Sequence, residues 1–328
     1  MTKWGILATG TIAHKFAQTI KGMGEEATVI ACASRNEEKA KCFAKEYNIP
    51  KYYGSYEALV QDKEVDAIYI CTPNNFHYEN MKMCIEAGKA VLCEKPFTVN
   101  KKEAEEIFAL AKEKKVFVME AFWVKLLPLY KELHQLIETG SIGEVRHLRA
   151  EYGFIATGAR KDRKFDSSLA GGALLDIGIY NIGFASMVMG YYPKKIVSSM
   201  QKNAYGTDEF ETMILEYEGG RTASLTSTIG MAIPTQGVIY GTEGKIILPD
   251  YQKAECLIVE RYDGEKQEII RPFEVTGFEY QMREVAKCLK EGKLNSSIQT
   301  PENTLAVMQI MDDLRKSWEL RFDCEKQD

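Results

Sequence analysis

The feature that most constrains this chain is a regular alternation of short apolar runs and amphipathic helical patterns over its first 120 residues. The apolar runs, which we expect to be strands, lie at residues 3–7, 27–33, 67–70, 90–93 and 116–120. The helical patterns between them lie at residues 12–23, 36–47, 77–86 and 101–114. Continuously apolar strands are buried on both faces, and such strands alternating with helices form a parallel sheet between two helical layers. We therefore predict an α/β fold with a doubly wound parallel sheet for the N-terminal part of the chain.

The pattern changes after about residue 121, where strands follow one another with few helical interruptions. The expected strands lie at residues 145–152, 196–201, 212–217, 222–229, 237–240, 245–248 and 256–260. The expected helices lie at residues 129–138, 172–189, 278–291 and 301–319. Runs of strands bordered by helices are typical of an α+β domain with an open, mostly antiparallel sheet. The sequence therefore predicts two domains, residues 1–121 and residues 122–328.

Charge and cysteine content narrow the class of protein. The 328 residues carry a formal charge of −5, from 42 Lys and Arg against 47 Asp and Glu, so we do not expect nucleic acid as a partner. We interpret the densest basic stretch, Arg160 to Lys164, as a solvated loop. None of the eight cysteines form a C-x-x-C pair, which predicts free thiols and a cytoplasmic location. The start of the chain lacks a signal-peptide pattern, and we see no apolar run near the roughly 18 residues that cross a membrane.

The first predicted strand is followed by Ala8-Thr9-Gly10-Thr11-Ile12-Ala13, a turn that opens the first predicted helix. Its small residues match a dinucleotide-binding fingerprint, with alanine at the first and last of the three small positions. Gly10 would let the backbone approach a pyrophosphate, and the helix start at Thr11 and Ile12 would stabilise its charge. A tight turn also needs glycine when nothing binds, so the motif alone is weak evidence. Ala8 fits the first position if the turn needs no positive φ there.

The end of the second predicted strand indicates which dinucleotide binds. An acidic residue there would accept the ribose hydroxyl groups of NAD, but this chain has Ser34-Arg35-Asn36. Arg35 can pair with the 2′-phosphate of NADP and stack on adenine. Arg35 could also be a solvated residue near a helix start. We favour NADP over NAD because the carboxylate that would repel a phosphate is missing.

Two further motifs follow predicted strands of the parallel sheet, at the edge where ligands bind in this class of fold. After the strand at residues 67–70, Thr72, Pro73 and Asn74 form a turn, and His77 begins the next helix. His77 is either a catalytic base or, as we favour, a helix-start residue. After the strand at residues 90–93 comes Glu94-Lys95-Pro96, where the Lys95 ammonium could bind a substrate oxygen. The structural alternative is a lysine paired with a nearby acid.

The second domain contains Gly171-Gly172-Ala173-Leu174-Leu175-Asp176-Ile177-Gly178-Ile179-Tyr180. Asp176 and Tyr180 are four residues apart and share one face of a helix that is otherwise apolar. Buried polar groups need a partner or an open site, so we expect one beside this face. Tyr180 near a lysine ammonium could donate and accept a proton. A tyrosine with its hydroxyl satisfied in the core is the alternative.

These motifs together resemble the Gfo/Idh/MocA family of oxidoreductases, which includes glucose–fructose oxidoreductase and inositol dehydrogenase. The resemblance covers the whole chain, and its most specific part is Glu94-Lys95-Pro96 followed by Gly171-Gly172-x-x-x-Asp176-x-x-x-Tyr180. It implies a dinucleotide-binding Rossmann domain followed by a substrate-binding domain whose open sheet mediates dimerisation. It also implies that Lys95 and Tyr180 act on the reacting hydroxyl or carbonyl group, with Asp176 close by. The cofactor contacts would then come from Ala8, Gly10, Thr11, Ile12, Ser34, Arg35, Thr72, Pro73, Asn74, His77, Glu94, Lys95 and Pro96.

Within the family, the segments 174–180 and Glu120-Ala121-Phe122-Trp123 resemble the dimeric dihydrodiol dehydrogenase and NADP-linked D-xylose dehydrogenase branch. By this likeness, Trp123, Phe154 and Phe278 line the substrate pocket together with Asp176 and Tyr180. We predict a homo-oligomeric dehydrogenase or reductase that transfers a hydride between NAD(P) and a sugar, polyol or cyclic diol.

Two other functions stay open at this point. One is a dinucleotide-binding regulatory protein. The other is an enzyme that recycles tightly bound NAD during glycoside cleavage or epimerisation. We expect no metal, because the four histidines form no ligand cluster with acids or cysteines.

Overall fold

The computed structural model describes residues 1–325, with the backbone alone described at residues 159 and 160. The chain divides into two compact units. The first unit combines Met1–Trp123 with Glu274–Leu305, and the second combines Val124–Phe273 with the described residues from Ala306 onward. The sequence-based division at residues 121 and 122 did not anticipate that residues 274–305 return to the first unit.

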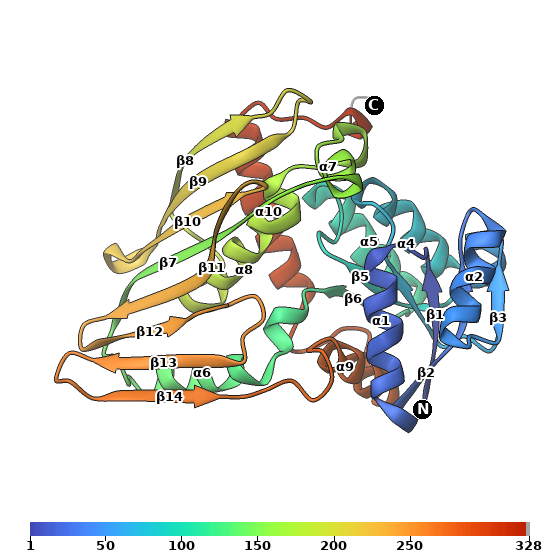
Figure 1. Cartoon of the computed structure of the whole chain (residues 1–328), viewed down its shortest axis with the longest axis horizontal. Helices are drawn as coiled ribbons and strands as arrows, with labels where there is room; N and C mark the ends of the chain where they lie inside the picture. The colour runs from blue at the N-terminus through green and yellow to red at the C-terminus, as the bar shows by residue number, and fades with distance from the viewer. Residues whose placement is uncertain (326–328) are drawn as a thin grey trace. The chain divides into compact units, whose positions relative to one another are not determined.

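The first unit contains a six-stranded parallel sheet in the order β3-β2-β1-β4-β5-β6. Figure 1 labels strands β1, β2, β3, β5 and β6 of this sheet. Its strands are β1 (Thr2–Leu7), β2 (Ala27–Ala33), β3 (Lys51–Tyr53), β4 (Ala67–Ile70), β5 (Ala90–Glu94) and β6 (Val118–Ala121). Every residue of β4, β5 and β6 is buried, as expected for strands covered on both faces. The predicted doubly wound sheet is therefore confirmed, with β3 as an edge strand that the sequence pattern did not reveal.

Three of the six described helices of the first unit begin at a side chain that accepts a hydrogen bond from a free N–H group of the helix. The six are α1 (Thr11–Gly22), α2 (Glu37–Tyr47), α3 (Tyr56–Val60), α4 (His77–Glu86), α5 (Lys101–Lys114) and α9 (Glu279–Lys290), with short 3₁₀ turns at Gly24–Glu26 and Asn74–Phe76. Asn36, Ser55 and Asn100 accept hydrogen bonds at the starts of α2, α3 and α5. No side chain caps α1, which leaves its N-terminal N–H groups open to a ligand.

The second unit contains an eight-stranded sheet in the order β14-β13-β12-β11-β7-β10-β9-β8. Its strands are β7 (Val145–Ile155), β8 (Lys195–Lys202), β9 (Asp208–Glu216), β10 (Thr222–Thr228), β11 (Gly230–Gly241), β12 (Gly244–Leu248), β13 (Cys256–Arg261) and β14 (Lys266–Ile270). All neighbouring pairs are antiparallel except β7 with β10, which confirms the mostly antiparallel sheet. The sequence pattern did not reveal β14.

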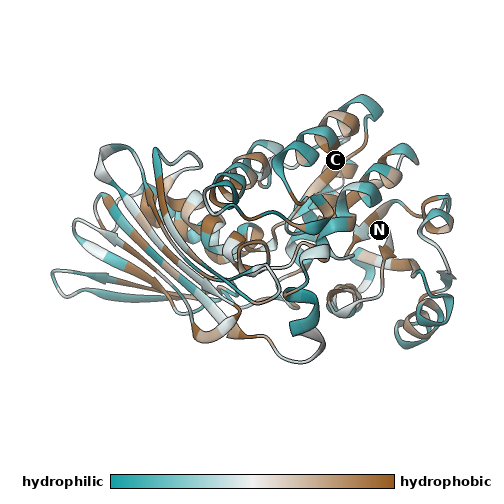
Figure 2. Ribbon diagram, turned by 90° about the horizontal axis from the view of Figure 1, so that it is seen from above, coloured by the Kyte–Doolittle hydropathy of each residue, from teal (hydrophilic) through white to brown (hydrophobic). Residues whose placement is uncertain are grey.

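The helices of the second unit are α6 (Pro128–Glu138), α7 (Ala159–Lys164) and α8 (Ile179–Met189), while α10 (Pro301–Ser317) begins in the first unit and continues into the second. Short turns lie at Trp123–Leu126, Ser167–Leu169, Glu218–Gly220 and Asp323–Glu325. Hydrophobic and hydrophilic residues alternate along the strands, as Figure 2 shows, because one face of the sheet packs on helices such as α8. The basic stretch interpreted as a solvated loop is instead helix α7.

The long apolar helix predicted over residues 172–189 contains a π-helical segment, Leu174–Gly178, before α8 begins. Within the described residues, the stretch Ser167–Met189 alone is long and apolar enough to cross a membrane by composition, but 89% of its apolar window is buried in the protein. A buried helix that is apolar on all sides is typical of a protein core. Helix α8 therefore forms the centre of the second unit.

Candidate active site

The turn between β1 and α1 has the backbone geometry of an anion-binding site. Gly10 has an extended backbone (φ −79°, ψ −177°), and a side chain added there would find no heavy atom within 4 Å. Thr11 and Ile12 form the uncapped start of α1, whose N–H groups and dipole favour a negatively charged group. This open cradle fits the pyrophosphate of a dinucleotide.

Ala8 differs from our expectation, because the turn does require a positive φ there. Its φ is +81°, a value that glycine adopts readily and alanine adopts at a cost. The backbone is held by Ala8 N donating to Ala33 O and by the Cys71 thiol, which lies 3.3 Å from Ala8 O. These bonds show that the neighbouring strands hold the alanine in this conformation.

At the end of β2, Arg35 is exposed and its guanidinium lies 5.2 Å from the centre of the Phe76 ring. Ser34 accepts a hydrogen bond from Asn36 N at 3.3 Å, and residues 34–36 include no carboxylate. Burial raises the pKa of Tyr56, and the Arg35 charge opposes that rise. A cation at this strand end can bind a phosphate.

His77 joins the two loops that follow β4 and β5. Its ring is fully buried, with Nδ1 2.8 Å from Pro96 O and Nε2 3.0 Å from Thr72 O. Asn80 additionally donates to the Thr72 hydroxyl at 3.1 Å. Because both ring nitrogens face carbonyl oxygens, His77 has no lone pair directed at a ligand, which argues against a catalytic base. The ring instead fixes the distance between the Thr72-Pro73-Asn74 turn and the Lys95-Pro96 turn, and the Lys95–Pro96 peptide bond is cis.

Buried acids hold the Glu94-Lys95-Pro96 turn. Glu94 accepts a hydrogen bond of 2.5 Å from Tyr69, while Lys95 is only partly buried at the carboxyl edge of the sheet. Behind this turn, Glu120 is fully enclosed and its carboxylate accepts three hydrogen bonds, from Phe97 N (3.2 Å), Gln299 (2.9 Å) and Thr304 (2.8 Å). Burial raises the pKa of Glu120, and these donors counteract the rise. The turn is therefore anchored to the segment that returns from the end of the chain.

Trp123 and Phe278, two of the predicted substrate residues, lie together in the first unit. Their ring centres are 4.9 Å apart, and the Lys15 ammonium lies 4.9 Å from the Trp123 ring and 4.2 Å from the Phe278 ring. Such distances are typical of cation–π contacts. Lys15 was not among the residues predicted from the sequence.

In the second unit, Asp176 lies on the π-helical segment and pairs with Lys164 of α7. The side chains of Asp176 and Lys164 are 16% and 12% exposed, so the pair is largely withdrawn from water. The Lys164 ammonium is also 5.1 Å from the Phe154 ring. The charge of Lys164 therefore lies against a predicted catalytic residue and not in a solvated loop.

Tyr180 follows one turn later, at the start of α8, and is 6% exposed. Its ring centre is 6.2 Å from that of Tyr152, which is in turn 6.3 Å from that of Phe154. Asp176, Tyr180 and Phe154 thus belong to one cluster of charged and aromatic side chains. No sequence motif pointed to Tyr152, although it lies two residues before Phe154 and so on the same face of β7.

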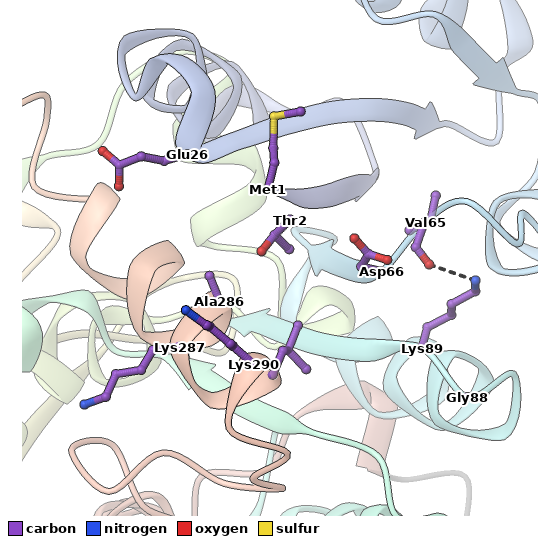
Figure 3. Close-up of a pocket in the computed structure, with 11 residues that line it drawn as sticks. Met1, Thr2, Glu26, Val65, Asp66, Gly88, Lys89, Ala286, Lys287 and Lys290 are labelled. Atoms are coloured by element: carbon purple, nitrogen blue, oxygen red, sulfur yellow. Dashed lines mark hydrogen bonds between the residues drawn. The ribbon is translucent and has the colours of Figure 1, made fainter.

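A separate cavity of about 690 Å³ lies at the opposite, amino edge of the parallel sheet (Figure 3). Its lining includes Thr2 at the start of β1, Asp66 just before β4 and Lys89 just before β5. Lys89 is engaged there with the carbonyl oxygens of Asp62 (2.6 Å) and Val65 (2.9 Å). Because none of the predicted site residues line this cavity, we assign it no part in the chemistry.

The open phosphate cradle, the lysine turn at the sheet edge and the acid–tyrosine helix define a dinucleotide-dependent oxidoreductase. Comparison with known proteins identifies the family. Residues 2–122 match the model of the oxidoreductase family with an NAD-binding Rossmann fold, and residues 130–247 match the GFO/IDH/MocA C-terminal domain. The chain belongs to the Gfo/Idh/MocA family and is an NAD(P)-dependent oxidoreductase, as the sequence motifs predicted.

Several relatives of similar length share one name. The trans-1,2-dihydrobenzene-1,2-diol dehydrogenase of Xenopus laevis is 38% identical over 321 residues, which cover 95% of this chain and 96% of the relative. The Homo sapiens enzyme of the same name is 34% identical over 336 residues, with 99% of each chain covered. This likeness agrees with the branch indicated by residues 174–180.

Among solved structures, KijD10, a 3-ketoreductase from Actinomadura kijaniata in complex with NADP and TDP-benzene, has a TM-score of 0.87. It is 26% identical, with 96% of this chain and 97% of that chain covered. An aldose–aldose oxidoreductase from Caulobacter crescentus has a TM-score of 0.86 at 22% identity, covering 97% of each chain, and so shares the fold.

Proposed function

We propose that this enzyme oxidises or reduces a CH–OH or carbonyl group of a sugar, polyol or cyclic diol, with Lys95, Asp176 and Tyr180 acting at the reacting oxygen. The observation that carries the proposal is that one chain combines an anchored lysine turn at the edge of its dinucleotide-binding sheet with a buried Asp–Tyr helix in its second unit. The full-length relatives named as diol dehydrogenases support this substrate class.

Each of the three residues has a role that suits its chemistry. Lys95 stabilises the alkoxide that develops on the substrate oxygen, since its ammonium is a compact positive charge. Tyr180, as the phenolate, takes the hydroxyl proton during oxidation and, as the phenol, returns it during reduction; a water relayed through Asp176 is the alternative base. The Lys164–Asp176 ion pair supports this role because it keeps Asp176 oriented within an apolar helix.

We further propose NADP as the preferred cofactor, which supplies the hydride chemistry when it is bound. Gly10 and the N–H groups of α1 would hold the pyrophosphate, and Arg35 would pair with the 2′-phosphate. The turns at residues 72–74 and 94–96 would line the nicotinamide. The exposed Arg35 and the absence of an acid at residues 34–36 support NADP over NAD.

For the substrate, we propose contacts from Trp123, Phe154 and Phe278. Aromatic rings pack against the apolar faces of sugars and cyclic diols, while the polar groups of the site take the hydroxyls. Phe154 lies 5.1 Å from the Lys164 ammonium, close to Asp176 in the same cluster, which supports its place in such a pocket.

The experiment that tests this function follows absorbance at 340 nm with NADP⁺ and NAD⁺ in parallel, against aldoses, inositols and cyclic diols. Lys95→Ala is the test variant, and Lys112→Ala, an exposed lysine on α5, is the matched control. We expect NADPH to form with one substrate class, to vanish in Lys95→Ala and to persist in Lys112→Ala. Dinucleotide binding without net turnover would refute the proposal and favour a regulatory protein or a recycled cofactor.

We also propose that the enzyme is a cytoplasmic homo-oligomer that associates through the outer face of its eight-stranded sheet. Val197 and Ile214 stand opposite each other on β8 and β9 and are 46% and 45% exposed, which is unusual for paired apolar side chains. Within the described residues the cysteines form no disulfide bond, which suits a reducing compartment. We expect light scattering to show a dimer or larger species that Val197→Glu dissociates, and a monomer at all concentrations would refute it.

A further inference from the structure

Two acidic side chains are buried beneath the helix that carries Asp176. Asp208 and Glu211 lie at the start of β9, and both are 0% exposed. The function proposed above assigns them no role. Charged groups are almost never buried without partners, so this pair requires an explanation.

The two carboxyl groups contact both ends of the π-helical segment. Asp208 Oδ2 accepts a hydrogen bond of 2.5 Å from Leu174 N, the first residue of that segment. A side chain at Gly172 would overlap Asp208 Oδ1, and one at Gly178 would come within 2.7 Å of Glu211 Oε1. The glycines therefore allow the helix to approach the acids closely.

Asp208 takes the place of an N-terminal cap. Gly172 has a φ of +117°, so the chain turns sharply before the helix and the Leu174 N–H has no acceptor in a preceding turn. A carboxylate at a helix start is also stabilised by the helix dipole. This cap comes from a strand 34 residues further along the chain.

One proton shared between the acids would engage two of their three remaining carboxyl oxygens. Among the described residues, no N–H group donates a hydrogen bond to Asp208 Oδ1 or to either carboxyl oxygen of Glu211, and the Ser227 hydroxyl is the neutral donor near Glu211. Ionising both of two adjacent buried carboxyl groups costs much free energy, because burial removes the water that would screen their repulsion. The pKa of Glu211 is raised well above its usual value by burial and then by the Asp208 charge. Glu211 therefore holds the proton and can donate it to Asp208.

We propose that Asp208 and Glu211 are positioning residues for Asp176 and Tyr180. The Glu211 O–H group donates a hydrogen bond to Asp208 and holds the Asp208 carboxylate against Leu174 N. This contact sets the helical turn that carries Asp176 and Tyr180. The inference rests on the function proposed for Asp176 and Tyr180. π-Helical turns are rare and often lie at functional sites, and this one needs an acceptor from outside the helix.

The surroundings of the pair are specific enough to predict a pH dependence. Arg315 of α10 is the charged group that faces Asp208, and the Ser227 hydroxyl of β10 faces Glu211. Arg315 lowers the pKa of Asp208 and Ser227 lowers the pKa of Glu211, but burial raises both pKa values by more. Loss of the shared proton at high pH leaves two buried negative charges, so we expect the turn to loosen as pH rises.

The test compares Glu211→Leu, Glu211→Gln and Asp208→Ala with the full-length protein. We expect Asp208→Ala and Glu211→Leu to lower kcat about 10- to 100-fold, the range for losing a hydrogen bond to a charged group, with KM for the dinucleotide changed less than twofold. Glu211→Gln should rescue kcat, because its amide donates to Asp208 and does not ionise. The loss of kcat at high pH should then disappear.

Hydrogen exchange at the Leu174 amide provides a readout that does not depend on turnover. Exchange at the Leu174 amide should be at least tenfold faster in Asp208→Ala than in the wild type. In the wild type, exchange should also rise with pH more steeply than the intrinsic exchange rate does. This additional rise with pH should be absent in Glu211→Gln. Glu284→Gln, which alters a buried acid of the first unit, is the matched control. Wild-type exchange and kcat in Glu211→Leu, or an unchanged pH profile in Glu211→Gln, would overturn the proposal.

These measurements separate the two proposals. If the wild type reduces no dinucleotide with any substrate, the proposed function fails while Leu174 exchange still decides whether the acids hold the turn. If Asp208→Ala does not fold, the pH profile of exchange in Glu211→Gln decides the question.

Discussion

Replacing Ala8 by glycine should stabilise the first unit. An L-residue with positive φ loses roughly 1–2 kcal/mol relative to glycine in the folded state, and Ala8 has a φ of +81°. Glycine loses more backbone entropy on folding than alanine does, and this cost offsets about 0.5–1 kcal/mol of the stabilisation. We expect a net increase of about 1 kcal/mol in the free energy of unfolding, and hence a rise of about 2–4 °C in the unfolding temperature.

Urea unfolding followed by tryptophan fluorescence measures this change. Trp4 and Trp123 report on the first unit, and a Trp318→Phe background removes the signal from the second. Ala33→Gly is the matched control, because this buried strand residue has an ordinary φ and should lose about 1 kcal/mol. A variant Ala8→Gly that is no more stable than the wild type would show that the turn stores no such strain.

Three further predictions concern the cofactor, the core and the thiols. Arg35→Ala should raise KM for NADP⁺ about 10- to 100-fold and leave KM for NAD⁺ unchanged, as steady-state kinetics would show, because one charged hydrogen bond to phosphate contributes about 1.5–3 kcal/mol. Glu120→Leu should lower the free energy of unfolding by about 3 kcal/mol or more in urea, because it leaves three buried donors without an acceptor. Burial raises the pKa of Cys32 from 9.0 to about 12, so the thiol ionises at lower pH in the unfolded chain than in the folded protein. The free energy of unfolding should therefore fall by about 1.4 kcal/mol per pH unit between pH 9.0 and about 12. Alkaline urea titrations of wild type and Cys32→Ala, which should have the shallower slope, check this sign.

Each of these predictions has a result that would contradict it. Equal losses for both dinucleotides in Arg35→Ala would mean that Arg35 shapes the loop instead of binding phosphate, and Lys39→Ala on the exposed start of α2 serves as the control. Glu120→Leu with wild-type stability would mean that its donors find other acceptors. The raised pKa of Cys32 predicts a free energy of unfolding that falls above pH 9. If the free energy of unfolding stays constant there, the thiol ionises equally in the folded and unfolded states.

The sequence by itself determined the class of fold and the positions of the motifs. Continuous apolar runs between helical patterns specify a doubly wound sheet, because burial on both faces requires that pattern in neighbouring residues. The turns at Gly10, Thr72 and Lys95 then had to lie at the carboxyl edge, since each follows a strand of a parallel sheet. Hydrophobic periodicity and the order of the motifs along the chain are properties of neighbouring residues, so they can be determined from the sequence alone.

The tertiary structure alone decided how distant residues meet. The return of residues 274–305 to the first unit, where Gln299 and Thr304 bind Glu120, has no signal in local periodicity. The pairing of Lys164 with Asp176 also has no signal in local periodicity. The sequence does not distinguish a charged side chain on the surface from one in a buried ion pair. The positive φ of Ala8 likewise arises from strand contacts that override the preference of alanine. Such pairings depend on which elements pack together, because the burial and desolvation that make them matter exist only once the chain has folded.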